Sequence, residues 1–436
     1  MTRIDWDKLD EESRARALAR PEADGRESLS RQVTDIIRRV RLEGDAALRD
    51  FAKRFDGVAL DALRVAPAAF KAAAEVLTDE QHQAIRTAIR NVEAFHAAQL
   101  PPPVSVETSP GVTCRRITRP IRAVGLYVPA GTAPLPSTVI MLAVPAALAG
   151  CPRRVLCTPP RPDGGADPAV LVAAEACGVD EVYLAGGAQA VAAMAYGTES
   201  VPAVDKIFGP GNAWVTEAKL QVSRDPDGAA LDLPAGPSEV LVIADADADA
   251  AFVAADLLSQ AEHGPDSQVV LVTPSAALAE AVDAAVRTQL ATLPRAEITG
   301  RALAHARAVI TPDLATAFEV SNRYGPEHLI LQVADAGGWL DRVETAGSVF
   351  LGPWTPESLG DYCSGTNHVL PTYGYARAWS GLSVTDFQLS MSVQEATRDG
   401  IARLGPVART LAELEGLDAH ALAVSLRLAA ASTGND

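Results

Sequence analysis

The chain has 436 residues, of which 48% are hydrophobic and 21% are charged, and its formal net charge at pH 7 is −17. This length exceeds what one compact core supports, so two or three domains are expected. The negative charge argues against nonspecific binding to nucleic acid or to an anionic membrane surface. No uninterrupted apolar run reaches membrane-spanning length, so neither nucleic acid nor a membrane is an expected partner.

The first 25 residues are polar and acidic and lack the apolar segment of a secretory signal. They predict a charged helical arm. The five cysteines have no paired CxxC spacing, which suits a reducing, cytoplasmic compartment. Cys151 and Cys177 end apolar helical patterns and Cys157 lies within an apolar strand pattern, so buried, inert thiols are expected there.

Two kinds of pattern follow each other along the chain. Residues 28–100 carry amphipathic helical patterns with a period near 3.6 residues. From Arg122 to about residue 235, and again from Ser238, strand-like runs alternate with helical runs, which predicts parallel strands joined by crossover helices. After a long polar loop that begins at Thr355, the chain from Ser390 reads as helical. The expected fold class is therefore α/β, with two doubly wound, Rossmann-like domains, a helical N-terminal arm and a small helical C-terminal tail domain.

Two strand-to-helix junctions are rich in glycine. Gly186-Gly187 precedes Gln189, and Gly209-Pro210-Gly211 precedes Asn212. Such turns let backbone N–H groups approach a phosphate or a nucleotide. Neither run is the G-x-G-x-x-G fingerprint, and short turns of this kind need glycine for plain geometry about as often.

A possible metal-binding pair ends the helical pattern of residues 255–263. Gln260 and His263 are three residues apart, so their side chains can point at one atom. A surface pair near a helix end is the commoner interpretation of such spacing. The histidines at element ends, together with Asp361, offer nitrogen and oxygen ligands that suit Zn²⁺ or another divalent ion and would leave the site open to a substrate.

Glu327-His328 is a candidate acid–base pair. Neighbouring residues on a strand point to opposite faces, so both can serve one pocket only if the pair lies in the turn formed by Gly325-Pro326. A turn with an exposed Glu and a half-buried His remains equally open at this point.

Nine runs spread from about residue 120 to residue 430 resemble the histidinol dehydrogenase family. They are GLYVPAGTAPLPST, GGAQAVAAMAYGT, KIFGPGNAWV, DLPAGPSEVL, LLSQAEHGPDSQ, NRYGPEHL, PESLGDYCSGTNHVLPT, SGLSVTDF and EGLDAHALAV. One departure is Ala130 in VPAGT, where the family usually has a second glycine.

The resemblance implies roles for individual residues. It implies zinc ligands at Gln260, His263, Asp361 and His420. Substrate contacts are implied at those four ligands and at Ser238, Glu327, His328, His368 and Glu415, and contacts to NAD at Tyr127, Gln189 and Asn212. Glu327 and His328 are the implied catalytic residues: His328 as the base that accepts the alcohol proton, and Glu327 as the group that activates the hydrating water.

The implied reaction is the oxidation of L-histidinol to L-histidine through L-histidinal, in two NAD⁺-dependent steps with one zinc per subunit. The implied assembly is a cytoplasmic homodimer, in which the tail of one subunit completes the site of the other. A related zinc-dependent dehydrogenase of another small diol or amino alcohol is the alternative enzyme, and a non-catalytic binding protein is the alternative outside enzymes.

The expected domain division follows from these patterns and the resemblance. It has four parts: residues 1–25 as the arm; residues 26–126 with 236–381 as a first α/β domain that carries the metal and acid–base residues; residues 127–235 as a second, NAD-binding α/β domain; and residues 382–436 as the tail exchanged in the dimer.

Overall fold

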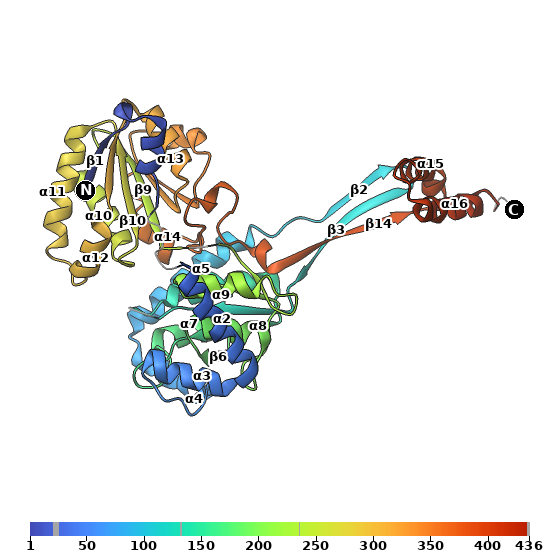
Figure 1. The fold of residues 1–436 in the computed structure, drawn as a ribbon, viewed down its shortest axis with the longest axis horizontal. Coiled ribbons are helices and arrows are strands. Elements are labelled where there is room, and N and C mark those ends of the chain that lie inside the picture. The colour runs from blue at the N-terminus through green and yellow to red at the C-terminus, as the bar shows by residue number, and fades with distance from the viewer. Residues whose placement is uncertain (21–25, 131–132, 235, 434–436) are drawn as a thin grey trace.

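Two α/β lobes and a thin projecting arm make up the molecule (Figure 1). The structure is a computed structural model that describes residues 1–20, 26–130, 133–234 and 236–433. One lobe is built on a six-stranded sheet and the other on a five-stranded sheet, and we name them by these sheets. The expected α/β class with doubly wound parallel sheets is confirmed.

The six-stranded sheet is parallel throughout, in the order β1-β11-β10-β9-β12-β13. Its strands are β1 (Thr2–Asp5), β9 (Glu239–Ala244), β10 (Gln268–Thr273), β11 (Arg307–Ile310), β12 (His328–Gln332) and β13 (Ser348–Leu351). Alternate residues of a strand face opposite layers. Accordingly Val240 and Val242 pack towards α10 (Ala250–Ala261), α11 (Ala276–Leu290) and α12 (Ala296–Leu303). Leu241 and Ile243 pack towards the N-terminal segment and α13 (Leu314–Tyr324).

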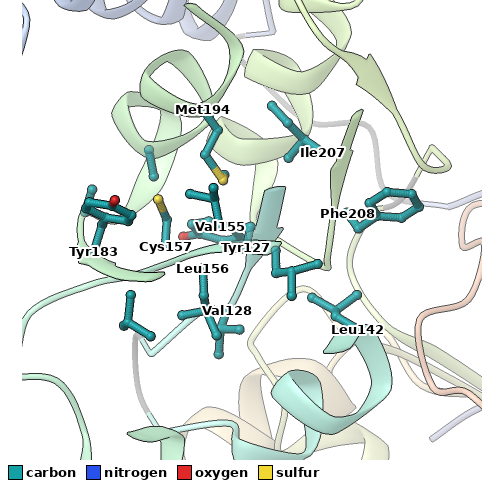
Figure 2. Close-up of a cluster of buried hydrophobic side chains, with 14 of the residues drawn as sticks. Tyr127, Val128, Leu142, Val155, Leu156, Cys157, Tyr183, Met194, Ile207 and Phe208 are labelled. Carbon is teal, nitrogen blue, oxygen red and sulfur yellow. The ribbon is translucent and has the colours of Figure 1, made fainter. Parts of the chain in front are cut away.

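The five-stranded sheet is also parallel, in the order β6-β5-β4-β7-β8. Its strands are β4 (Ala123–Tyr127), β5 (Arg153–Thr158), β6 (Glu181–Leu184), β7 (Lys206–Phe208) and β8 (Ala230–Leu231), connected by α6 (Pro136–Ala149), α7 (Pro168–Ala176), α8 (Gly187–Tyr196) and α9 (Ala213–Val222). Figure 2 shows the core around Tyr127, Leu156 and Met194. A Cβ on Gly125 would lie 2.7 Å from Met194 Sδ, so a glycine in β4 lets α8 pack closely.

The helices of residues 26–97 cover the five-stranded sheet, and this differs from the expected division, which grouped residues 26–126 with 236–381. They are α2 (Arg26–Glu43), α3 (Asp45–Phe51), α4 (Pro67–Val76) and α5 (Asp79–Ala97). Val33, Phe51 and Val92 belong to the same hydrophobic cluster as Leu142 and Leu156. An amphipathic pattern shows that a helix has an apolar face, but not which sheet that face covers.

The N-terminus begins with a strand where a helical arm was expected. β1 pairs in parallel with β11 at the edge of the six-stranded sheet, and only α1 (Glu11–Ala17) is α-helical before residue 20. Four residues are too few to show a strand period against the surrounding charges. Residues 21–25, the rest of the expected arm, lie outside the described residues.

A three-stranded antiparallel sheet forms the projecting arm (Figure 1). It consists of β2 (Val104–Ser109), β3 (Val112–Pro120) and β14 (Gln388–Ala396), in the order β14-β3-β2. α15 (Arg398–Leu414) and α16 (Asp418–Ser432) lie at its tip, away from both lobes. The helical interpretation from Ser390 is therefore wrong up to Ala396, because β14 is a strand only through its pairing with β3, about 270 residues earlier.

Cys151 and Cys157 are buried in the five-stranded lobe, as expected, whereas Cys177, for which burial was also expected, is half-buried. Burial raises the pKa of Cys151 to about 11 and that of Cys157 to about 12, so both thiols are protonated and unreactive at neutral pH. None of the helices in the described part of the chain combines the length and the apolar character that crossing a membrane requires.

Candidate active site

The two lobes meet at a cleft that brings opposite edges of the two sheets together. Gly209 and Gly211, which follow β7, line it from the carboxyl edge of the five-stranded sheet. Ser238, Glu327 and His368 line it from the other lobe, where Ser238 and Glu327 directly precede β9 and β12. Residues from the carboxyl ends of one sheet therefore face residues from the amino ends of the other.

Glu327 and His328 are both buried, with 5% and 4% of their surface exposed, which excludes the interpretation as an exposed turn. α13 ends at Gly325, whose φ of +63° suits glycine, and β12 begins at His328. Glu327 thus lies in the turn and His328 at the first position of the strand. This placement lets two adjacent side chains serve one site.

The backbone of Glu239 holds both side chains. Its N–H donates to Glu327 Oε2 (2.8 Å), and its carbonyl lies 3.0 Å from His328 Nδ1. Because a carbonyl only accepts hydrogen bonds, Nδ1 donates to it, and Nε2 is the ring nitrogen that can exchange a proton with a ligand. Nε2 is buried, has no hydrogen-bond partner among the described residues, and lies 3.7 Å from Asp361 Oδ1.

Burial and mutual repulsion shift the titration of this cluster. Burial raises the pKa of Glu327 to about 8 and that of Glu357 well above its usual value. Burial opposes charge on His328, but Glu357, Glu327 and Asp361 outweigh it and raise the pKa of His328 well above its usual value. Several buried carboxyls around one imidazole cannot all ionise without a positive partner, and a divalent cation would supply one.

Three side chains form a candidate metal centre: the donor atoms of His263, Glu357 and Asp361 all lie within 4.8 Å of one another. His263 follows the end of α10, and the two carboxylates are four residues apart on α14 (Glu357–Tyr362), which places them on one face. This nitrogen and oxygen donor set fits Zn²⁺.

Glu357 was missed from the sequence, although its i, i+4 spacing to Asp361 was a usable signal. Gln260 is fully buried beside it. With its amide oriented so that the nitrogen faces acceptors, Gln260 donates to Glu357 Oε1 (2.9 Å).

His368 points an unsatisfied nitrogen into the same region. Its Nε2 is buried without a hydrogen-bond partner among the described residues, and burial lowers the pKa of His368, which keeps the ring neutral. Its neighbour Asn367 is fixed by donation to Met141 O (2.8 Å) and acceptance from Val369 N (2.9 Å). A buried neutral imidazole with a free ring nitrogen can form a hydrogen bond with a polar group of a ligand.

The three residues expected to contact a dinucleotide lie at the carboxyl edge of the five-stranded sheet, near its switch point between β4 and β7. Tyr127 ends β4 with its ring in the core, and its hydroxyl accepts from Gly187 N (3.0 Å) (Figure 2). Gln189 lies in the first turn of α8 and is buried. Asn212 caps α9 by accepting from Trp214 N (3.1 Å).

Gly209 shows why the turn before Asn212 needs glycine. Its φ is +124°, and a Cβ there would lie 2.2 Å from Tyr127 O. The geometry of the turn therefore requires glycine at this position. This requirement is compatible with a nucleotide bound at the same turn. Ala130 lies at the end of the described residues 26–130, and its neighbours Gly131 and Thr132 lie outside the described residues.

Glu415 and His420 are not brought to this site within one chain. Both are exposed and lie at the tip of the arm, at the end of α15 and the start of α16 (Figure 1). Of the expected site residues, Ser238, Gln260, His263, Glu327, His328, Asp361 and His368 gather in one region.

The fold and the cleft are those of a two-domain α/β enzyme with an acid–base pair facing glycine-rich turns. A family model described as histidinol dehydrogenase matches residues 18–428. The histidinol dehydrogenase of Pectobacterium atrosepticum is 56% identical over 429 residues, covering 98% of this chain and 96% of that protein. That of Escherichia coli K12 is 56% identical over 427 residues, covering 98% of both.

A solved structure agrees with these relatives. The crystal structure of histidinol dehydrogenase from Elizabethkingia anophelis superposes with a TM-score of 0.94 at 44% identity and covers 99% of each chain. The chain therefore belongs to the histidinol dehydrogenase family, as its sequence runs indicated, and it is an oxidoreductase.

Proposed function

We propose that the chain oxidises L-histidinol to L-histidine through L-histidinal, in two successive steps that each use NAD⁺. The observation that carries the proposal is His328 Nε2, which is buried without a hydrogen-bond partner among the described residues. It lies 3.7 Å from Asp361 of the candidate metal centre, and the adjacent Glu327 lines the cleft. The glycine-rich turns across the cleft are suited to a dinucleotide, which supplies the hydride acceptor when bound.

Zinc is the metal that we expect at the cluster. Gln260, His263 and Asp361 would hold it together with the partner's His420. Zinc would anchor and orient the imidazole and amino groups of the substrate. Glu357 would orient Gln260 by accepting from its amide nitrogen, which leaves the amide oxygen for the metal.

The acid–base steps follow from the contacts around Glu239. A bound divalent cation would offset the carboxylates that raise the pKa of His328, so the ring would be neutral, and its Nε2 would accept the proton of the alcohol in the first step and that of the aldehyde hydrate in the second. The same cation would favour the ionised form of Glu327, whose pKa burial otherwise raises to about 8, and Glu327 would then accept a proton from the water that hydrates the aldehyde. Ser238, His368 and the partner's Glu415 would bind the substrate, whereas Tyr127, Gln189 and Asn212 would bind the dinucleotide.

A homodimer with a shared site is the assembly that we propose. The tip of the arm exposes large apolar side chains in α15 and α16: Leu411 (55%), Leu414 (79%), Leu422 (58%) and Leu426 (62%). Contiguous exposed apolar surface marks an interaction site. A second copy that receives the arm would cover it and gain Glu415 and His420. The free, buried thiols Cys151 and Cys157 agree with a cytoplasmic enzyme.

The test is the amount of NADH formed per L-histidinol consumed, with purified protein before chelation, after chelation and after zinc is restored. We expect about two NADH per substrate, lost on chelation and recovered with zinc, because a two-step oxidation transfers two hydrides. One NADH with released aldehyde would contradict the four-electron reaction. Faster turnover of another amino alcohol would contradict the substrate.

A further inference from the structure

Arg20, in the N-terminal segment, forms a fork with the carboxylate of Glu239. Its Nε and Nη2 donate to Glu239 Oε1 and Oε2, the second at 2.8 Å. The Glu239 side chain is fully buried and that of Arg20 is 11% exposed. A two-point contact between a planar guanidinium and a carboxylate sets orientation as well as distance.

The same guanidinium also holds the turn that leads to the acid–base pair. Its Nη2 donates to Tyr324 O (3.1 Å) and Gly325 O (3.3 Å), the last carbonyls before Pro326 and Glu327. It lies over the ring of Tyr324, 4.0 Å from its centroid. One side chain thus contacts both the end of α13 and the start of β9.

These contacts converge on the two catalytic side chains. Glu239 holds Glu327 through its N–H and His328 through its carbonyl, while its carboxylate receives Arg20 and Tyr373 N (3.0 Å). A displacement of the Glu239 backbone would therefore move the supports of both side chains at once, and the contacts of its carboxylate with Arg20 and Tyr373 N oppose such a displacement.

Arg20 is not needed to attach the N-terminal segment to the lobe. β1 already pairs with β11, and Arg307 donates to Ala17 O (2.7 Å) and Ala19 O (2.7 Å). Arg3 adds an exposed ion pair with Glu280. The hydrogen bonds that Arg20 makes with the described residues go instead to Glu239 and to the turn that precedes Glu327.

We infer that Arg20 is a positioning residue of the active site, which sets Glu327 and His328 through the carboxylate and backbone of Glu239. The inference rests on the proposed function for its kinetic readout. Misplacing a catalytic group by about 1 Å can cost about 10²-fold in rate.

The experiment compares Arg20→Ala and Arg20→Lys with the wild-type enzyme, and uses Arg3→Met as the matched control on the same segment. We expect kcat for L-histidinol to fall about 10²-fold in Arg20→Ala and less in Arg20→Lys, which keeps the charge but loses the fork. KM for NAD⁺ should change less than about twofold, because the dinucleotide turns belong to the other lobe. Added guanidinium at a non-denaturing concentration should restore part of the kcat of Arg20→Ala.

Unchanged kcat in both Arg20 variants would overturn the inference, as would an equal loss in Arg3→Met or a loss that guanidinium does not relieve. A wild-type enzyme that forms no NADH from L-histidinol would instead refute the proposed function. The crystal structure of Arg20→Ala tests the placement without any substrate. Glu327 and His328 displaced from Glu239 would support the inference, and unmoved side chains would overturn it.

Discussion

The two proposed catalytic side chains, Glu327 and His328, are both held by one neighbouring residue. The N–H and carbonyl groups of Glu239 hold Glu327 and His328, and its carboxylate is fixed by Arg20. Backbone groups at the amino end of β9 cannot change rotamer, so the catalytic side chains are held on rigid supports. Single substitutions can therefore test the two side chains separately from the residues that hold them in place.

Glu327→Gln should slow the second oxidation more than the first. Glutamine can still accept from Glu239 N through its amide oxygen, but it cannot take a proton from water. We expect a loss of about 10²-fold or more in the step that starts from L-histidinal, and a smaller loss in the step that starts from L-histidinol. Rapid-quench kinetics with each compound as the starting substrate measures both. Equal losses would remove Glu327 from the hydration step, and His328→Asn, expected to slow both steps, is the control.

Asp56 gives a pH-dependent prediction outside the site. Its Oδ2 is buried without a hydrogen-bond partner among the described residues, and burial raises the pKa of Asp56 to about 6. The folded state therefore binds this proton more tightly than the unfolded state does. The resulting contribution to the free energy of unfolding is fully present below the ordinary pKa of 3.8 and is lost as the pH rises through about 6. Asp56→Asn should raise Tm by about 2 °C at pH 8 and less at pH 5. The control Asp61→Asn, which changes an exposed carboxylate, should leave Tm unchanged at both pH values. A Tm gain in Asp56→Asn that is the same at pH 5 and pH 8 would contradict the argument.

At the scale of elements, the turn between β7 and α9 is clamped by a buried ion pair. Lys219 Nζ donates to Gly209 O (3.0 Å), Asp232 Oδ2 accepts from Gly209 N (2.8 Å), and the two side chains contact each other. Both are buried, with 5% and 6% exposed. Gly209 is thus held at both its N–H and its carbonyl, beside the expected dinucleotide position.

Lys219→Met should both destabilise the lobe and weaken dinucleotide binding. It leaves Asp232 as an unpaired buried charge, which costs about 3–5 kcal/mol, and it frees the carbonyl of Gly209. We expect a lower urea midpoint and a higher KM for NAD⁺. Addition of Asp232→Asn should recover part of the stability but not the KM, because the turn stays unclamped. A double variant no more stable than Lys219→Met would contradict the role of the unpaired charge.

At the scale of the whole molecule, the arm carries expected site residues away from the chain's own cleft (Figure 1). In the proposed homodimer, Glu415 and His420 would serve the site of the other copy, and an isolated chain would have an incomplete site. This placement agrees with the shared site of the proposed homodimer, and the tip's exposed leucines supply the apolar contact surface.

Mixing two inactive variants tests this assembly. His420→Ala damages the tip and His328→Ala damages the cleft, so a mixed dimer has one intact site. After co-refolding, we expect about one quarter of wild-type activity, because about half of the dimers are mixed and each has one of two sites intact. His328→Ala mixed with Glu327→Ala is the control, since both changes lie in the cleft and no intact site can form. Absence of recovery in the first mixture would contradict the exchange.

Local patterns in the sequence were enough for the features that depend on residues close together in the chain. The alternation of strands and helices predicted two parallel sheets, and Gly325-Pro326 predicted the turn that holds Glu327, although His328 is already the first residue of β12. The spacing of Gln260 and His263 predicted that the two side chains point at one place, and in the structure His263 lies beside Asp361 and Glu357, while Gln260 contacts Glu357. Each of these follows from backbone geometry within a few residues.

Only the tertiary structure decided the features that join distant segments. The sheet covered by residues 26–97, the pairing of β1 with β11, and the arm built from β2, β3 and β14 all depend on partners far away in sequence. The contact of Glu357 with Gln260 and the fork between Arg20 and Glu239 are of the same kind. A pattern of apolar and polar residues predicts that a face will be buried or that a charge will be paired. It does not name the partner, because that choice is made by packing across the whole chain.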